Sequence, residues 1–294
     1  MTISLSRVFV AALAGVLLLA ALPVSAQSAA AATPLPATKV LDVRGVRIGE
    51  GAPKTIVPIT ATTAEEALAQ AARIAANADT DIAEWRIDYL DNALDGKALA
   101  RLGPQVAKAL HGKPLLLTFR TKAEGGARPI ADADYGTLYA TLLQARFADL
   151  LDVEMFRDAA VVQALVAQAH AAGVSVVMSS HDFQRTPDTA EIVARLQRQQ
   201  ALGADVLKIA VMPRDAGDVL KLLDATWQLR RSSDRPLLTM AMGGTGVVSR
   251  LSGETFGQAL TFGMLGKASA PGQVEVGRLR EVLDTIHQAA SAAR

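Results

Sequence analysis

Residues 174–212 read VSVVMSSHDFQRTPDTAEIVARLQRQQALGADVLKIAVM, and this stretch contains the unit from which the chain is built. Two runs rich in β-branched and other apolar residues, 174–181 and 205–211, flank a segment rich in Ala, Leu, Arg and Gln at 189–202. The runs have the length of strands, and the middle segment has the composition of a helix. A strand, a helix and a second strand in this order predict a βαβ unit with parallel strands.

The same alternation continues over most of the chain. Further strands are predicted at 55–59, 82–88, 114–120, 151–154, 236–242 and 260–265, and further helices at 63–76, 133–147, 158–172, 216–230 and 276–290. Eight strands separated by helices favour an α/β fold of the (β/α)8 type, the TIM barrel. The alternative is a doubly wound open sheet, but the chain has neither a G-x-G-x-x-G fingerprint after a first strand nor a Walker sequence. Residues 40–48, VLDVRGVRI, predict an N-terminal β-hairpin ahead of the barrel.

Residues 1–26, MTISLSRVFVAALAGVLLLAALPVSA, have the pattern of a secretory signal peptide. Arg7 precedes an apolar run, Pro23 ends it, and Val24-Ser25-Ala26 offers small residues for the peptidase. The alternative is an uncleaved membrane anchor, for which the run is short. Cleavage after Ala26 leaves 268 residues. Residues 27–38, rich in Ala, Pro, Ser and Thr, predict a flexible linker before a barrel domain at 39–294.

Composition excludes several classes of function. The chain of 294 residues has no Cys, which removes disulfides, thiolate metal sites and thiol nucleophiles together. A formal net charge of +1 and only 2 Trp, 3 Tyr and 7 Phe give no footprint for nucleic acid. No His pair has metal-ligand spacing, and no G-x-S-x-G elbow is present, so a metal hydrolase and a serine hydrolase are both disfavoured. After the first 26 residues, no stretch is long and apolar enough to cross a membrane.

Charged and titratable side chains gather on one face of five consecutive predicted strands. Alternation places Ala83, Trp85 and Ile87 on the face that packs under helices, and the polar residues of the same strand on the other. A barrel binds its substrate at the C-terminal ends of the strands, where most of these groups fall. Any one of them can be a salt bridge or a solvated strand end, but several buried charges in series need partners or a ligand. The set comprises Glu84, Arg86, Asp88, Arg120, Asp152, Glu154, His181 and Lys208.

Lys208 carries the most information because its strand, DVLKIAVM, is otherwise apolar. Desolvation lowers the pKa of a buried lysine, and a neutral amine attacks carbonyl groups as Schiff-base enzymes do. The alternative is a lysine neutralised by a carboxylate from the next strand. The strand alone does not decide between these two interpretations.

Four histidines are present, and His181 alone ends a predicted strand on the polar face, which makes it the candidate for proton transfer. Three loops follow other strands. Glu124-Gly125-Gly126 follows the third, Met242–Gly246 follows the seventh with Arg250 just beyond it, and residues 268–273 follow the last. Arg250 has the fork geometry that holds a carboxylate, and the small residues of 268–273 suit a mobile lid. An ordinary solvated turn is the alternative for each loop.

These pieces resemble the type I 3-dehydroquinate dehydratases. The resemblance covers Gly45 to Ala290 and rests on motifs that occur in the family's order: EWRID (84–88), TFRTKAEGG (118–126), DVE (152–154), SSHDF (179–183), KIAVMP (208–213), TMAMG (239–243), VSRLSGETFG (248–257) and ASAPGQ (268–273). The chain departs from some members in having Pro58 where they have Ser, and in its export signal.

The resemblance implies a (β/α)8 barrel that dehydrates 3-dehydroquinate to 3-dehydroshikimate by syn elimination through an imine, without a metal or organic cofactor. It implies Lys208 as the Schiff-base lysine, His181 as the proton-transfer residue and Glu124 as the residue that orients and charges His181. It also implies that the hydroxyl groups of the substrate are held by Glu84, Arg86 and Arg120, that Arg250 binds its carboxylate, and that Ser269 and Gln273 close over it.

Two other functions remain open at this point. A class I aldolase also needs a lysine at a strand end, and a secreted barrel could bind a polyhydroxy acid without turnover. Export predicts a periplasmic location and a catabolic role in quinate breakdown, with no membrane association after cleavage. We also expect a homodimer.

Overall fold

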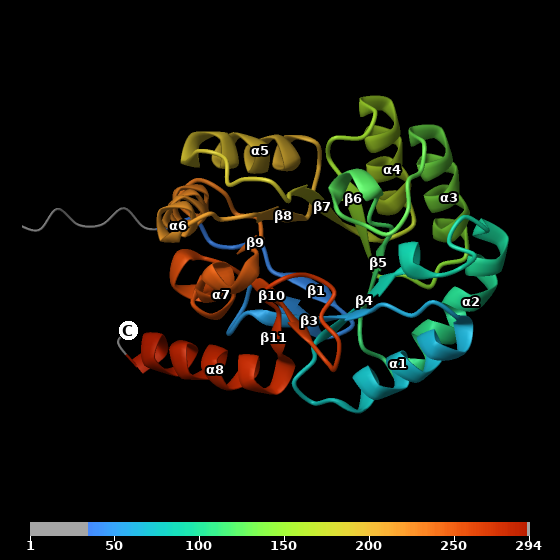
Figure 1. Ribbon diagram of the computed structural model, residues 1–294, viewed down its shortest axis with the longest axis horizontal. Coiled ribbons are helices and arrows are strands. Elements are labelled where there is room, and N and C mark those ends of the chain that lie inside the picture. The colour runs from blue at the N-terminus through green and yellow to red at the C-terminus, as the bar shows by residue number, and fades with distance from the viewer. Residues whose placement is uncertain (1–34, 293–294) are drawn as a thin grey trace, which may run out of the picture. The chain divides into compact units, whose positions relative to one another are not determined.

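A curled parallel sheet lies at the centre of the fold in the computed structural model, which describes residues 35–292 (Figure 1). The strand order is β11-β10-β3-β4-β5-β6-β7-β8-β9. From β3 to β9 it follows chain order without the reversal of a doubly wound sheet. The Ala259 N–H donates to Leu237 O (2.9 Å), which joins the β9 edge to the start of β10. The strands are β3 (Lys54–Ile59), β4 (Ile82–Arg86), β5 (Leu115–Thr118), β6 (Leu150–Glu154), β7 (Ser175–Asp182), β8 (Val206–Val211), β9 (Leu237–Ala241), β10 (Leu260–Met264) and β11 (Val274–Glu275).

Within residues 35–292, seven α-helices connect strands and an eighth, α8, follows the last strand, so the arrangement is consistent with a TIM-barrel-like α/β fold (Figure 1). Short polar side chains begin several of them. Thr63, for example, accepts from the Glu66 N–H at the start of α1, while the Glu66 carboxylate accepts from the Thr62 N–H. The helices are α1 (Ala64–Ala76), α2 (Gly96–Ala109), α3 (Asp132–Gln144), α4 (Ala159–Ala171), α5 (Thr189–Ala201), α6 (Ala216–Arg230), α7 (Gly243–Leu251) and α8 (Val276–Ala292).

The two faces of the sheet are as the alternation predicts. Ala83 and Trp85 are fully buried in the core cluster that the outer face shares with the helices. The inner face begins with one apolar layer, to which each strand from β3 to β10 contributes a residue, and polar side chains follow it further along the strands. This layer consists of Ile56, Ile82, Leu116, Leu150, Val177, Val206, Leu238 and Leu260.

A two-stranded antiparallel sheet, β1 (Leu41–Val43) with β2 (Val46–Ile48), precedes the barrel. Val43 and Ile48 are buried and belong to the same cluster as the apolar layer. The polar end of the barrel interior therefore faces away from this small sheet, and the apolar layer separates the two.

Two local predictions are wrong. Met242–Gly246 is not a loop, because α7 starts at Gly243. A Cβ at Gly246 would lie 2.4 Å from Ala241 O, and Ser249 Oγ accepts from the Ala241 N–H, so the small residues serve close helix–strand packing. Asp88 does not extend β4, since it lies in a single 3-10 turn at Ile87–Tyr89, where its carboxylate binds Arg86.

The predicted signal peptide at 1–26 and most of the linker lie outside the described residues. Within the described part, no helix combines the length and the apolar character that a membrane span requires.

Candidate active site

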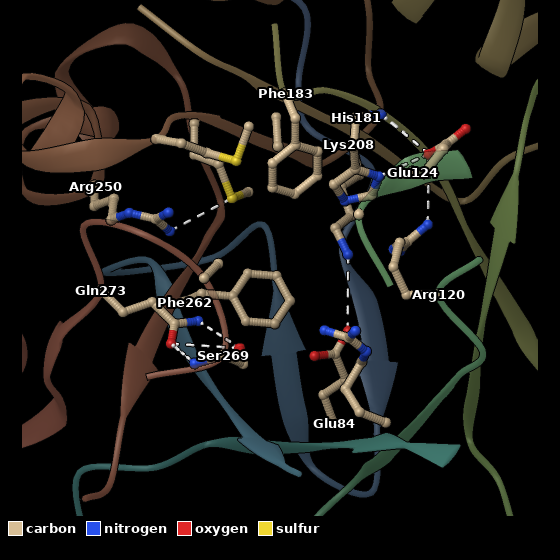
Figure 2. Close-up of a pocket in the computed structure, with 16 residues that line it drawn as sticks. Glu84, Arg120, Glu124, His181, Phe183, Lys208, Arg250, Phe262, Ser269 and Gln273 are labelled. Atoms are coloured by element: carbon tan, nitrogen blue, oxygen red, sulfur yellow. Dashed lines mark hydrogen bonds and ion pairs between the residues drawn. The ribbon is translucent and has the colours of Figure 1, made fainter. Parts of the chain in front are cut away.

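One pocket of about 490 Å³ opens at the polar end of the barrel interior, and all nine site residues implied by the family resemblance line it. Asp88, Asp152 and Glu154 of the predicted polar face do not line it. The nine come from β4, β7 and β8, from the segment after β5, from α7 and from the segment between β10 and β11. Figure 2 shows these side chains around a common space, with Arg250 and Gln273 on one side and His181 and Glu124 on the other. The residues are Glu84, Arg86, Arg120, Glu124, His181, Lys208, Arg250, Ser269 and Gln273.

Lys208 projects from β8 into this pocket and is only 3% exposed. Its Nζ lies 2.8 Å from Asp152 Oδ2, 3.8 Å from Glu84 Oε1 and 4.8 Å from the centre of the Phe262 ring. Of the two interpretations that the sequence left open, the structure shows an ion pair, with a carboxylate two strands away. The ammonium must therefore lose a proton before the amine can attack a carbonyl group.

Arg120 holds the carboxylates around the lysine in place. Its guanidinium donates to Asp152 Oδ1 (2.7 Å), Glu154 Oε1 (2.8 Å) and Ser179 Oγ (3.0 Å). Burial opposes ionisation of Asp152, but the charges of Arg120 and Lys208 outweigh it and hold the pKa of Asp152 below its usual range. Asp152 is therefore the stable anion to which both cations are tied.

His181 and Glu124 form a second pair on the pocket wall. Glu124 Oε2 lies 2.8 Å from His181 Nδ1 and also accepts from the His181 backbone N–H at 3.1 Å, so the carboxyl group fixes the orientation of the ring. Burial and the cations Arg120 and Lys208 lower the pKa of His181 well below its usual range. Burial and the neighbouring Glu154 raise the pKa of Glu124 to about 8.

The hydrogen bonds of Glu124 fit the expectation that it orients His181, and its role in charging the ring stays a prediction. Desolvation and two nearby cations both disfavour a positive charge on His181, which favours its neutral imidazole. A neutral imidazole held by Nδ1 leaves Nε2 free to act as a base toward the pocket.

Arg250 is a buried cation without an acidic partner among residues 35–292. Its NH2 group donates to Pro271 O (3.2 Å), and its NH1 group contacts Met240 Sδ (3.5 Å). Its Nε has no hydrogen-bond partner within the described part of the chain. Burial lowers the pKa of Arg250 to about 10, so the group still carries its charge near neutral pH. A guanidinium in this state is a site for an anion that enters the pocket.

Arg86 and Glu84 on β4 complete the polar wall. Arg86 binds Asp88 through two bonds of 2.8 and 2.9 Å, and its guanidinium lies 4.8 Å from the Tyr89 ring. Glu84 accepts from Thr118 Oγ1 at 3.0 Å. Both side chains are thus oriented before a ligand binds.

The segment after β10 lies over the Arg250 side of the pocket. Gln273 Oε1 accepts from the Ser269 N–H (2.8 Å), and its Nε2 donates to Ser269 Oγ (3.0 Å). The two residues expected to close over a ligand thus bond to each other, and Pro271 between them bonds to Arg250. Movement of this segment would therefore change or break the hydrogen bond of the Arg250 guanidinium to Pro271.

Known proteins similar to this chain in sequence and fold identify its family. A family model described as type I 3-dehydroquinase matches residues 55–290. The chain belongs to the type I 3-dehydroquinase family. It is 48% identical over 266 residues to the catabolic 3-dehydroquinate dehydratase of Acinetobacter baylyi, which covers 90% of this chain and 98% of the relative. It is 49% identical over 247 residues to the 3-dehydroquinate dehydratase of Listeria monocytogenes, which covers 84% of this chain and 97% of the relative.

A solved structure gives the same answer for the fold. The type I 3-dehydroquinate dehydratase of Clostridium difficile, crystallised with covalently modified comenic acid, superposes with a TM-score of 0.82 at 42% identity and covers 86% of this chain and 99% of that one. The resemblance of the motifs to the type I 3-dehydroquinase family is therefore confirmed.

Several pocket residues of this family member were not among those expected. Met240 and Phe262 share the inner face of their strands with Leu238 and Leu260, so alternation alone could have found them. Phe183 could not be found in this way, because it follows β7 and reaches the pocket by stacking over His181 (ring centres 6.5 Å apart).

Proposed function

We propose that this chain is a 3-dehydroquinate dehydratase, a hydro-lyase that converts 3-dehydroquinate to 3-dehydroshikimate and water. The observation that carries the proposal is a pocket that holds Arg250, a buried guanidinium with no acidic partner among residues 35–292, together with the Lys208 amine and the His181 imidazole. A hydroxylated keto acid supplies what each group lacks: a carboxylate for Arg250, a ketone for Lys208 and an acidic C–H for His181.

Binding brings the substrate carboxylate to Arg250. The preorganised side chains of Glu84, Arg86 and Arg120 face the hydroxyl groups, and Ser269 and Gln273 close the opening. Since Glu84 and Arg86 already hold fixed orientations, little rotamer freedom is lost when the substrate binds.

Lys208 then reacts with the C3 ketone. The ammonium gives up a proton and the amine adds to the carbonyl carbon. The carbonyl oxygen receives two protons from the nitrogen in all and leaves as water, so the positive charge stays on the nitrogen of an iminium ion. This cation withdraws electrons and acidifies the neighbouring C2–H. Asp152 and Glu84 are the carboxylates next to the reacting nitrogen and stabilise its positive charge.

His181 carries the proton in both directions. Its neutral imidazole takes the C2 proton to give an enamine, and the resulting imidazolium protonates the C1 hydroxyl as it leaves, on the same face of the ring. Water then hydrolyses the imine and frees the product and Lys208, so the net change is the loss of one water molecule. Proton transfer of this kind typically accelerates a reaction by about 10²–10⁴-fold.

The direct test incubates the purified protein with 3-dehydroquinate and follows the ultraviolet absorbance of the enone product. Water loss supports the proposal. Two carbonyl fragments would indicate an aldolase, and binding without any product would indicate a binding protein; either result would reject the proposal.

We further propose that residues 1–26 are a signal peptide and that the enzyme acts in the periplasm in quinate breakdown. The charge, apolar run and small residues of this segment support export, and the catabolic name of the Acinetobacter baylyi relative supports the pathway. Fractionation should find the activity in the periplasm, with a mature chain that begins at Gln27. Activity confined to the cytosol would reject export.

A homodimer stays a prediction. Light scattering on the purified protein should give twice the mass of one chain.

A further inference from the structure

A glutamine on a helix outside the ring of strands forms hydrogen bonds with both the backbone N–H and the backbone carbonyl oxygen of Lys208. Gln199 lies near the end of α5, the helix that packs beside β8 (Figure 1), and its side chain is fully buried. Its Oε1 accepts from the Lys208 N–H at 2.9 Å, and its Nε2 donates to the Lys208 carbonyl oxygen at 2.8 Å. The side-chain amide therefore holds one residue of the strand at two points.

This contact is unusual for a residue inside a sheet, where backbone groups ordinarily bond to neighbouring strands. Glutamine is seldom fully buried, and its amide must be paired when it is. Here the amide is paired with the residue that carries the reactive amine. The two hydrogen bonds of this buried amide fix the position of the Lys208 backbone.

The same amide extends to the strand that holds the ion-pair partner. Gln199 Nε2 also lies 3.5 Å from Sδ of Met155, the residue that follows β6. Asp152, which binds Lys208 Nζ, lies on β6 three residues earlier. Gln199 thus contacts both the backbone of Lys208 and the end of the strand that anchors its amine.

We propose that Gln199 is a positioning residue, which fixes the Lys208 backbone so that Nζ meets the substrate carbonyl in a reactive geometry. The inference rests on the proposed imine chemistry and adds a residue outside the pocket to it. Gln199 does not line the pocket, so it acts only through Lys208.

Gln199→Leu removes both hydrogen bonds with little change in volume. We expect kcat and the rate of borohydride trapping of the imine to fall about 10²-fold, because a displaced reacting group costs that much. KM should change by less than about twofold, since the groups that bind the substrate are untouched. The matched control is Gln200→Leu, which removes the next amide of the same helix and its bond to Ser233 Oγ (2.7 Å) and should trap at the wild-type rate.

Gln199→Glu gives a second readout, which a loss of folding in Gln199→Leu does not affect. A protonated carboxyl can accept from the Lys208 N–H and donate to its carbonyl oxygen, whereas the ionised form faces that oxygen with a negative charge. The ratio of variant to wild-type kcat should therefore fall as the pH rises.

The outcomes separate this inference from the proposed function. Wild-type protein that forms no product with 3-dehydroquinate rejects the proposed function. An active wild type, together with a Gln199→Leu variant that folds and traps the imine at the wild-type rate, overturns the role of Gln199 alone. If Gln199→Leu does not fold, a ratio for Gln199→Glu that stays near one at all pH values overturns it as well.

Discussion

Lys208 and Asp152 form an ion pair inside the barrel, with Nζ 2.8 Å from Oδ2 and neither side chain more than 3% exposed. Breaking a buried pair by removing one partner usually leaves a costly charge behind. Asp152 is different, because Arg120 NH2 remains 2.7 Å from its other oxygen. The site can therefore lose its lysine and keep a paired carboxylate, which makes the lysine testable by substitution.

Lys208→Met should fold and have no detectable dehydratase activity, because the variant keeps much of the side-chain volume and lacks the amine. Borohydride added with substrate should increase the mass of the wild-type peptide that contains Lys208 and leave the variant unchanged. An unmodified wild-type peptide, in protein that was active before reduction, would contradict imine formation.

Arg250→Met should weaken substrate binding without loss of stability. The guanidinium is buried and has no acidic partner in the described part of the chain, so its removal also removes a desolvation cost. We expect KM to rise about 10–100-fold, the value of one charge-assisted hydrogen bond, and the melting temperature to stay level or rise. Arg250→Lys should restore part of the binding. An unchanged KM in Arg250→Met would show that the carboxylate binds elsewhere.

In the pH profile of kcat/KM, the loss of activity on the acid side should have its midpoint below pH 6.5. Burial, Arg120 and Lys208 lower the pKa of His181, so the neutral base persists at pH values where an exposed histidine is protonated. A pH profile of the wild type measures the midpoint, and His181→Ala should remove the activity that defines it. A midpoint above pH 6.5 would contradict the neutral imidazole.

Stability should fall between pH 6.5 and 8. Glu124 has a folded pKa of about 8, above the unfolded value of 4.5, so in this window the folded chain holds a proton that the unfolded chain has lost, and each rise in pH favours the unfolded chain. His181 has the opposite effect, because its folded pKa is lowered, but it acts only below pH 6.5. Urea unfolding should show a decrease on the order of 1–2 kcal/mol from pH 6.5 to 8. The decrease should be absent in Glu124→Gln, and an equal decrease in that variant would assign it to another group.

Gly125→Ala should lower the dehydratase activity by displacing a side chain of the active site. Gly125 has a φ of +82°, and an added Cβ would lie 2.2 Å from the ring of Phe183, which stacks over His181. Gly112→Ala is the matched control, with a φ of +95° and nothing within 4 Å of the added atom. Both should lose about 1–2 kcal/mol of stability from the backbone conformation, and Gly125→Ala alone should lose activity. Equal activity in the two variants would show that Phe183 has no role in the site.

Local pattern was sufficient for much of the fold and for the faces of the strands. The alternation in 82–86 assigns Trp85 to the helices and Glu84 to the interior, and both assignments hold, because successive residues of a strand point to opposite faces. Composition was a poorer guide at 242–246, where the glycines serve contact between α7 and β9 and not a loop.

The sequence by itself determined the order of the barrel strands and of the helices other than α2 and α7, the inward face of Lys208 and His181, and, through the motifs, the family. These properties depend on residues close together in the chain or on residue types alone. Only the tertiary structure decided which charges meet: Lys208 with Asp152, Arg120 with Glu154, Glu124 with His181, and Arg250 with no acid among residues 35–292. The physical reason is that pairing, burial and pKa depend on distances between strands far apart in sequence, and closure of the barrel sets those distances.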